Sequence, residues 1–467
     1  MRGRGLLPVL LLLGGGCHKA PGPSPSPPPS LSPRPNVLLI TIDTLRADHL
    51  GFFGYTRATS PALDRFGSTA LAFDNAFTYW PKTRGSMVVL LTGTTPSTNG
   101  YSRSHPVLFP FNTTLASVLA KSGYTTAAIV DNSNIAAANG YSLGFGTYRQ
   151  TWLEEGLKTE AARGEAITEG ARGFLSHPPA SPFFLWLHYV NPHAPYTPPP
   201  PFDKGFLDKE AEGGPVLPVV SDFHRGIHKE WAEAAPGHRN LGYFVAEYDG
   251  EIATSDHEVG EVLDALRASG VEDRTVVVVL SDHGESLGEH DYYFDHGEDV
   301  FRPCLRIPFF LRVPGLSPTR RTDLASTLDL VPTILDAVKV SFPPGLAGRS
   351  LLEPPEPHRH LFAQNDRDLA AGFDERFALV MTPEGTRERY ALYDTVKDPG
   401  EITDVGSLHP EEFRVRRREL EEYLDRRERE WSQTLRLTEG QKLAPPEARS
   451  CEEMKALGYL PASQKCR

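Results

Sequence analysis

The sequence predicts an α/β fold built around a large, mainly parallel sheet. Four continuous apolar runs, rich in Val, Ile and Leu, read NVLLITI, TTAAIV, FFLWLHYV and VVVVL. Such runs are typical of parallel strands that are buried on both faces. The polar residues that follow them are Asp43, Asn132, His193, and the pair Asp282 and His283. Because open α/β sheets bind ligands beyond the carboxyl ends of their strands, we expect these side chains to face one crevice.

The other elements follow from local patterns. Residues 61–70 and 113–121 are expected to be helical, and residues 248–266 form a helix with Ile, Val and Leu on one face. A further strand is expected at residues 307–313. Candidate strands at 377–381 and 390–393 precede a charged helix over 410–431, whose apolar stripe includes Phe413, Leu420, Leu424 and Trp431.

Length and charge suit one large α/β domain with a smaller part appended. The chain has 467 residues and a net charge of −12, which argues against nucleic acid as a partner. Of its four cysteines, Cys304 is expected to be a buried thiol. Cys451 and Cys466 are the plausible disulfide pair if the chain is exported.

Residues 1–17 predict export. Two arginines precede an apolar run at residues 6–13 that is too short to span a membrane, so it reads as a signal peptide. Cys17 follows small residues, as in a bacterial lipoprotein cleavage site, and predicts a protein of the cell envelope anchored to the membrane by a lipid. The alternative is an ordinary signal peptide with an incidental cysteine. Residues 18–35 are Pro/Ser-rich and predict an extended linker.

The stretch WPKTRGSMVVLLTG, residues 80–93, holds a candidate nucleophile. Thr83 stands just before a helix that we expect to begin near Ser86. The start of a helix offers unpaired N–H groups and a positive dipole end, which suit sulfate or phosphate. Taken alone, a Thr and a Ser in such a turn are more often helix caps.

Four segments together resemble the sulfatase branch of the alkaline phosphatase superfamily: NVLLITIDTLRADHLGFFGY, TRGSMVVLLTG, LHYVNPHAPY and SDHGESLGEH. The resemblance covers about residues 35–350. It implies an alkaline-phosphatase-like sandwich with a large mixed, mainly parallel sheet flanked by helices, plus a small C-terminal α+β subdomain. The catalytic domain is then expected over residues 36–355, and the C-terminal subdomain with a helical tail over residues 356–467. The implied activity is hydrolysis of sulfate or phosphate esters.

Alignment with the sulfatase signature places Thr83 at the nucleophile, with Gly85 at the family's Pro and Met87 at its Arg. Sulfatases convert Cys or Ser at the nucleophile position to formylglycine, and Thr is not known to be converted. The resemblance therefore favours a Thr alkoxide, as in the phosphodiesterases and phospho-substituent transferases of the superfamily. A metal would have to lower the pKa of this hydroxyl, so Thr83 would be both ligand and nucleophile.

The metal ligands implied by the resemblance are Asp43, Thr83, Asp282 and His283. They would bind one divalent ion. Calcium-using arylsulfatases have Asn where His283 stands, so the imidazole favours zinc or manganese, while calcium or magnesium stays possible. Thr44 stands where arylsulfatases often have a second acidic ligand.

His193 and His296 are the other predicted catalytic residues. His193 belongs to the PHAPY motif and is expected to act as general acid or anion contact. His296 falls near the position of an anion-binding Lys in arylsulfatases and could protonate the leaving oxygen. A second metal bound by this pair is a minority alternative, and His188 is expected to be a core residue.

Asn132 and His290 are predicted to bind substrate. Asn132 could donate a hydrogen bond to the anion, although a turn-forming Asn is equally consistent with the sequence. His290 lies in the same segment as His296.

Three functions are consistent with the motifs. The favoured one is a metal-dependent hydrolase of anionic sulfate or phosphate esters, whose substrate could be a glycan or linked to a lipid. The second is a transferase that passes a phospho-substituent from Thr83 to an envelope acceptor. The third is a noncatalytic protein that binds an anionic glycan.

Overall fold

The computed structural model describes residues 34–221 and 224–438. The predicted signal peptide, the lipid site at Cys17, nearly all of the linker, and Cys451 and Cys466 lie outside the described residues. Cys304 is a buried free thiol, as predicted. No helix within the described residues is both long enough and apolar enough to cross a membrane.

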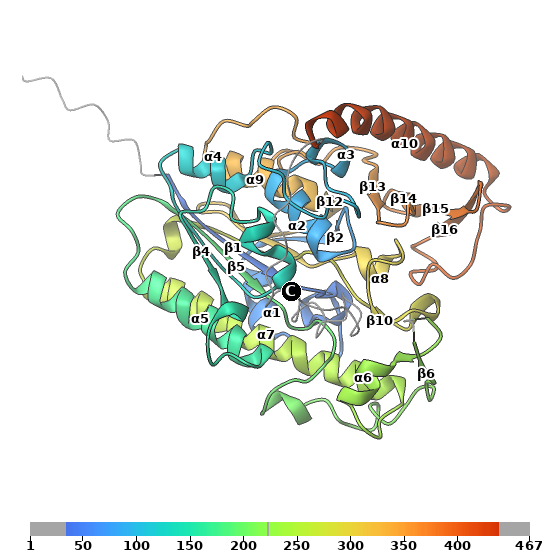
Figure 1. Cartoon of the computed structure of the whole chain (residues 1–467), viewed down its shortest axis with the longest axis horizontal. Helices are drawn as coiled ribbons and strands as arrows, with labels where there is room; N and C mark the ends of the chain where they lie inside the picture. Colours follow the sequence, from blue (N-terminus) through green and yellow to red (C-terminus); the bar gives the residue numbers. More distant parts are fainter. Residues whose placement is uncertain (1–33, 222–223, 439–467) are drawn as a thin grey trace, which may run out of the picture. The chain divides into compact units, whose positions relative to one another are not determined.

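An eight-stranded sheet forms the centre, in the order β12-β2-β11-β8-β1-β5-β3-β4 (Figure 1). The four apolar runs form its adjacent strands β8, β1, β5 and β3, which are parallel to one another. Only β11 runs antiparallel to both of its neighbours. The predicted mixed, mainly parallel sheet is confirmed. The strand bounds are β1 Asn36–Ile42, β2 Leu71–Phe77, β3 Thr125–Val130, β4 Thr147–Gln150, β5 Phe183–Tyr189, β8 Thr275–Ser281, β11 Phe309–Arg312 and β12 Thr319–Ser326.

Helices pack on both faces of this sheet. Alternate residues of β1 point to opposite faces: Leu38 and Ile40 belong to the apolar core under α1, α5 and α7, while Val37 and Leu39 belong to the core under α2, α4 and α9. Both cores exclude water, so each central strand stays buried along its length and its end is fixed by the packing around it. The helix bounds are α1 Pro61–Ser68, α2 Thr83–Thr92, α3 Pro96–Asn99, α4 Leu115–Lys121, α5 Glu160–Ser176, α7 Leu241–Ala268 and α9 Leu330–Ala337.

The segments between these elements carry short structure. Their bounds are β6 Val219–Val220, β7 Ile227–His228, α6 Lys229–Ala234, β9 Ser286–Leu287, β10 Tyr293–Asp295 and α8 Arg302–Leu305.

A second, antiparallel sheet of four strands follows, with one long helix. The strands are β13 Leu361–Gln364, β14 Ala370–Phe373, β15 Phe377–Glu384 and β16 Arg387–Asp394, and the helix is α10 Pro410–Thr438. The predicted charged helix therefore continues past Trp431. Leu420 of its apolar stripe is fully buried. The predicted boundary near residue 355 falls in the loop before β13.

Three strands of the large sheet, β12, β2 and β4, were not expected from the sequence. β12 reads TRRTDLAS and lies at the sheet edge, where the first half of the strand is largely exposed and needs no apolar residues. β2 reads LAFDNAF, and the polar Asp74 and Asn75 interrupt its apolar run because these two residues are only partly buried. β4 reads TYRQ at the other edge of the sheet, and all four of its residues are at least partly exposed. Partial exposure therefore hid all three strands.

Candidate functional site

Two neighbouring strand ends and one helix start meet at the candidate site. Parallel pairing of β1 with β8 sets Ile42 opposite Ser281, so the residues that follow them, Asp43 and Asp282, emerge together. The Ser281 hydroxyl locks this junction by donating to the Ile42 carbonyl at 2.7 Å. Thr83 enters as the first residue of α2.

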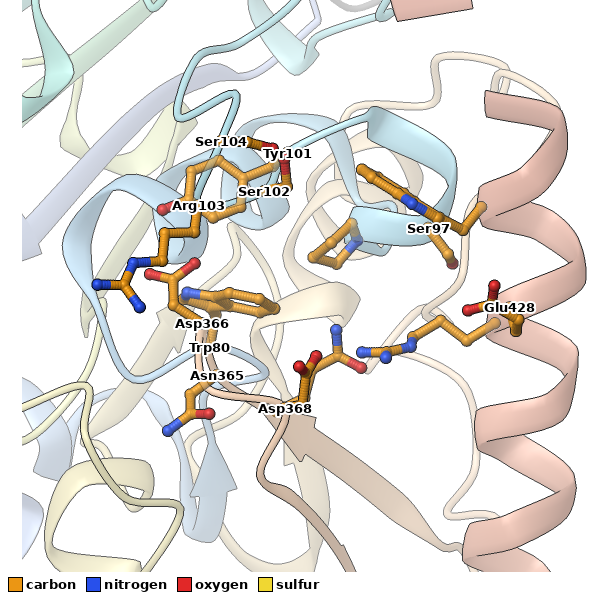
Figure 2. A pocket seen from close by; sticks show the side chains of 14 residues that line it. Trp80, Ser97, Tyr101, Ser102, Arg103, Ser104, Asn365, Asp366, Asp368 and Glu428 are labelled. Carbon is orange, nitrogen blue, oxygen red and sulfur yellow. Dashed lines mark hydrogen bonds between the residues drawn. The ribbon is translucent and has the colours of Figure 1, made fainter. Parts of the chain in front are cut away.

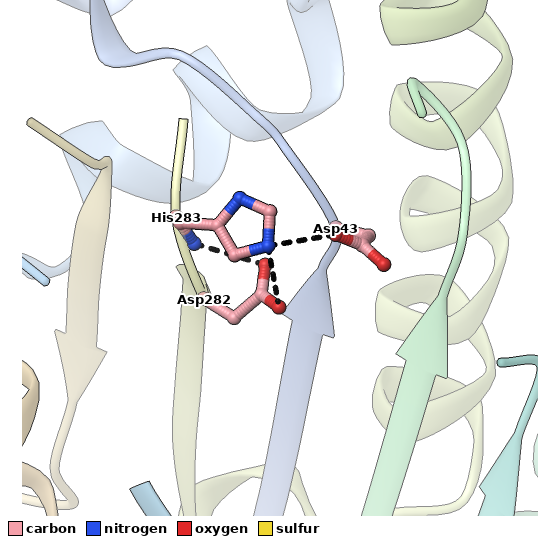
Figure 3. A group of neighbouring side chains, drawn as sticks. All are labelled: Asp43, Asp282 and His283. Carbon is pink, nitrogen blue, oxygen red and sulfur yellow. Dashed lines mark hydrogen bonds and ion pairs between the residues drawn. The ribbon is translucent and has the colours of Figure 1, made fainter. Parts of the chain in front are cut away.

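The four predicted metal ligands are brought into one group. Figure 3 shows His283 Nε2 between the two carboxylates, 3.4 Å from Asp43 Oδ1 and 3.4 Å from Asp282 Oδ2. Thr83 Oγ1 is 3.2 Å from His283 Nε2 and 3.5 Å from Asp43 Oδ2. All four side chains are fully buried. Ligand atoms of the two aspartates and the histidine lie within 4.8 Å of one another.

This group fits a divalent cation. Asp43 Oδ1 and Asp282 Oδ2 are buried and have no hydrogen-bond partner. Burial and the negative charge of Asp43 raise the pKa of Asp282 well above its usual range. Burial alone would also raise the pKa of Asp43, but the neighbouring histidines His188, His283 and His193 lower it to about 2. Buried carboxylate oxygens without partners are costly unless a cation compensates them. The chemistry of the residues present therefore suits the predicted metal.

His283 has the protonation state that a metal ligand needs. Burial lowers the pKa of its imidazole to about 4, so the ring is neutral at pH 7. Its Nδ1 lies 3.0 Å from the Gly284 carbonyl, which favours a proton on Nδ1 and leaves Nε2 as the acceptor that faces the aspartates.

Helix α2 starts three residues earlier than the sequence suggested. It begins at Thr83, and the Ser86 N–H already bonds to the Lys82 carbonyl at 2.9 Å. The Ser86 hydroxyl caps no helix; it donates to the Asp282 carbonyl at 2.7 Å. Ser86 therefore ties α2 to the end of β8 and holds Thr83 beside the carboxylates.

Asn132 supports a predicted ligand. Its side-chain amide donates to Asp43 Oδ2 at 2.7 Å, and its side-chain oxygen accepts from the Asn134 N–H at 2.9 Å. The residue thus forms the turn that we considered and also holds the Asp43 carboxylate. Its contact with a substrate anion stays a prediction.

His188 is a buried residue of β5, as predicted, but it also borders the site. Its Nδ1 lies 2.9 Å from Thr41 Oγ1, and its Nε2 lies 3.7 Å from Asp43 Oδ2. The parallel pairing of β1 with β5 places Thr41 opposite His188. Strand register would have revealed this neighbour of Asp43, whereas the apolar run around His188 concealed it.

His193 and His296 lie next to the aspartate and histidine group. The His296 ring is 4.3 Å from the His283 ring and 5.1 Å from the His193 ring, measured between centroids. His296 Nδ1 is 3.0 Å from Glu285 Oε1, and Tyr196 donates its hydroxyl to Glu285 Oε2 at 3.2 Å. Sequence reasoning missed Glu285 and Tyr196, although Glu285 lies in the segment SDHGESLGEH and Tyr196 lies in LHYVNPHAPY.

The structure places His290 outside this group. Its ring stacks on Phe301, with centroids 3.6 Å apart and planes 8° from parallel. Burial lowers the pKa of the ring. The ring therefore packs against Phe301, and the predicted contact of His290 with a substrate stays a prediction.

Positive charge reaches the site from a residue that the motif alignment did not use. Met87, at the position of the family's Arg, is fully buried in the apolar core. The stem of Lys82, by contrast, packs against Gly297, where an added Cβ would lie 2.9 Å from Lys82 Cδ. Burial lowers the pKa of His296, and the neighbouring His283 and His193 lower it further. The charge of Lys82 adds to this effect. Lys82 thus stands close to His296.

A buried carboxyl holds the segment that carries His193. Glu251 of α7 accepts a hydrogen bond from the Asn191 amide and another, at 2.7 Å, from the Thr197 N–H. Both bonds flank His193 in the chain. The loop after β5 is therefore fixed to α7, and the position of His193 follows from that anchor.

Glu251→Gln is expected to raise the free energy of unfolding at pH 8 by up to about 3 kcal/mol and to change it little at pH 4.5. Burial raises the pKa of Glu251 from 4.5 to about 7. Between about pH 4.5 and pH 7 the folded protein therefore keeps a proton that the unfolded chain releases. The contribution of this proton to the free energy of unfolding is lost as the pH rises through 7. Urea unfolding at both pH values measures the difference, with exposed Glu353→Gln as the control. A variant less stable than the wild type at pH 8 contradicts the assignment.

Several known proteins are similar to this chain over most of its length. Residues 35–340 match the sulfatase family model. An arylsulfatase of Clostridium perfringens is 25% identical, with 82% of this chain and 92% of the relative covered. A Delta 4,5-hexuronate-2-O-sulfatase of Bacteroides thetaiotaomicron is 25% identical, with 79% and 84% covered. The solved structure of a phosphonate monoester hydrolase of Agrobacterium radiobacter superposes with a TM-score of 0.68 at 21% identity, covering 85% of this chain and 96% of that one.

These findings confirm the predicted alkaline-phosphatase-like fold and the predicted family. The matched region holds both aspartates, Thr83 and the three histidines 193, 283 and 296. The chain belongs to the sulfatase family and is a sulfuric or phosphoric ester hydrolase of that family.

Proposed function

We propose that the protein is a metal-dependent hydrolase of sulfate or phosphate esters in which the Thr83 hydroxyl is the nucleophile. One observation supports this above all: Thr83 Oγ1 lies 3.2 Å from His283 Nε2 and 3.5 Å from Asp43 Oδ2 in a fully buried group. A bare hydroxyl is a weak nucleophile at neutral pH and must be activated by a neighbour. Thr83 stands among the side chains that would bring the activating charge.

Asp43, Asp282 and His283 would hold the ion, with Thr83 as the fourth ligand. When bound, a divalent ion lowers the pKa of a coordinated hydroxyl and offsets the negative charge that develops on the ester oxygens. The protein itself orients the nucleophile, because Thr83 is fixed at the start of α2 and is closed to water. The N–H groups of the first turn of α2 have no partners within the helix and can bind the ester oxygens.

His193 and His296 are assigned to the ester oxygens and the leaving group. The His296 ring lies beside both His283 and His193, and Glu285 engages Nδ1 of His296. Burial raises the pKa of the Glu285 carboxyl well above its usual range, so Glu285 can keep its proton and donate it to Nδ1 of His296. Nε2 of the neutral His296 ring then carries the proton that passes to the departing oxygen, as the Glu285 proton moves to Nδ1. Glu285 is then a positioning residue, which acts through His296 and does not touch the ester.

The substrate class that we propose is an anionic glycan ester. The hexuronate sulfatase among the relatives supports this choice. The export signal predicted at residues 1–17 and the lipid anchor predicted on Cys17 would place the reaction in the bacterial cell envelope.

Metal removal tests the proposal. The purified protein is assayed on an aryl sulfate, a phosphate monoester, a phosphodiester, a phosphonate monoester and a sulfated disaccharide, before and after dialysis against a chelator. We expect hydrolysis of at least one ester class, its loss on chelation, and recovery with zinc or manganese at a single ion per chain.

Full turnover by protein that contains no detectable metal would contradict the mechanism. The same reactions are run with an added alcohol, and the products are identified. Transfer of the phospho-substituent to the alcohol in preference to water would make the protein a transferase.

A further inference from the structure

A cavity of about 470 Å³ lies beside the nucleophile segment, between the chain after α2 and the C-terminal helix α10 (Figure 2). Its wall combines aromatic rings, carboxylates and guanidinium groups. The residues that matter for its chemistry are Trp80, Tyr101, Trp431, Asp366, Arg103 and Arg427. Its volume falls in the usual range for a small-molecule site, about 300–1,000 Å³.

Both walls of this cavity continue directly into the ester site. Trp80 precedes Thr83 by three residues, so their Cα atoms lie within about 11 Å. On the other wall, the Asn365 amide donates to the Gly297 carbonyl at 3.1 Å, and Gly297 follows His296. The charge of Lys82 also acts on both places, because it lowers the pKa of His296 and offsets the effect of burial at Asp366.

Two polar atoms of the wall are buried and have no hydrogen-bond partner. They are Trp80 Nε1 and Asp366 Oδ1. Trp80 is only 4% exposed. The Trp80 ring can lie here because α2 has glycine at position 85, where a Cβ would be 2.3 Å from Trp80 Cδ1. One of these atoms is a donor and the other is an acceptor. A hydroxyl group, which both accepts and donates, can serve as the partner of either atom.

The charges of the wall point to a ligand rich in hydroxyl groups and not to a bare anion. Two arginines, 103 and 427, are balanced by the carboxylates of Asp366, Asp368 and Glu428. Such mixed groups bind the hydroxyls and ring oxygen of a sugar, while the partly exposed ring of Trp431 offers a flat apolar surface to its C–H groups. An inorganic phosphate or sulfate would meet as much repulsion as attraction.

We propose that this cavity binds a saccharide unit of the substrate, next to the unit that carries the ester. The role given to this cavity rests on the proposed function. In that function, α10 and the β13–β14 segment form the part of the enzyme that selects the glycan. Its physical basis is independent of the ester chemistry, because it consists of two buried polar atoms without partners and the partly exposed ring of Trp431.

The test compares Asp366→Asn and Trp431→Ala with the wild type, and uses exposed Asp425→Asn of α10 as the matched control. Each protein is assayed on a sulfated disaccharide and on an aryl sulfate. In both cavity variants, we expect kcat/KM for the disaccharide ester to fall about tenfold more than kcat/KM for the aryl ester. In the control variant, kcat/KM should be unchanged for both esters. Equal losses on both esters would overturn the proposal, and thermal melting identifies a variant that has not folded.

Calorimetric titration with unsulfated disaccharides, chitobiose and a hexuronate–N-acetylglucosamine disaccharide, separates this inference from the proposed function. Binding by the wild type that weakens about tenfold in Asp366→Asn supports the cavity even if no ester is hydrolysed. If the wild type binds neither disaccharide at millimolar concentration, the saccharide assignment fails, and turnover of the aryl ester still decides the hydrolase proposal.

Discussion

Thr83→Ala is expected to lower kcat by about 10³-fold or more on every ester that the wild-type protein hydrolyses. The variant loses the only oxygen proposed to attack, while Asp43, Asp282 and His283 remain to hold a metal. Metal content should therefore be retained under saturating metal even as turnover is lost. Steady-state kinetics and metal analysis on the same preparation measure both.

Two further variants frame this result. Thr83→Ser keeps a hydroxyl at the start of α2 and should retain turnover within about tenfold of the wild type. Thr92→Ala removes a buried hydroxyl at the other end of the same helix, where Thr92 Oγ1 bonds to the Val88 carbonyl at 2.6 Å, and should leave kcat unchanged. Wild-type turnover by Thr83→Ala would exclude Thr83 as the nucleophile.

Asp282→Asn is expected to abolish tight metal binding and to reduce turnover by about 10²-fold or more. Its effect on stability should change sign with metal. In metal-free protein near pH 8, the ionised Asp282 carboxylate is disfavoured by burial and by Asp43, which raise its pKa. Removing that charge should raise the free energy of unfolding. With metal present, the wild type gains binding free energy that the variant lacks and should be the more stable protein.

Thermal melting with and without metal checks this reversal. Asp329→Asn serves as the control, because Asp329 is equally buried but pairs with Arg359 at 2.7 Å. It should destabilise the protein by a similar amount with or without metal. If Asp282→Asn is less stable than the wild type by the same amount in both conditions, Asp282 has a structural role and is not a ligand.

The central strands and the ligand group were predictable for one physical reason. Strands buried on both faces must be continuously apolar, so the point where each run ends is visible in the sequence, and parallel pairing brings those ends to one edge. The same reasoning predicts from the sequence that Asp43, Asp282 and His283 lie together. Thr83 was added to this group through the resemblance of its segment, residues 80–93, to the sulfatase signature.

The supporting residues could not be found in the same way. Glu285 and Tyr196 act through contacts between two loops that are 89 positions apart in the chain, and no local pattern records such a contact. His188 was hidden because its neighbour across the sheet, and not its own segment, gives it a place beside Asp43. His290 was assigned from its nearness to His296 in sequence, but a tight turn with φ of 56° at His290 sends its ring to Phe301.

The long helix α10 has a consequence for how such an enzyme can diversify. Trp431 and Arg427 sit on this helix, more than 340 positions after Thr83, and Thr434 fastens the helix to the Ser97 carbonyl at 2.7 Å. The residues proposed for catalysis all precede position 300. If the cavity binds a sugar as proposed, exchanges on one face of α10 would alter which molecules are accepted and leave the proposed catalytic residues unchanged.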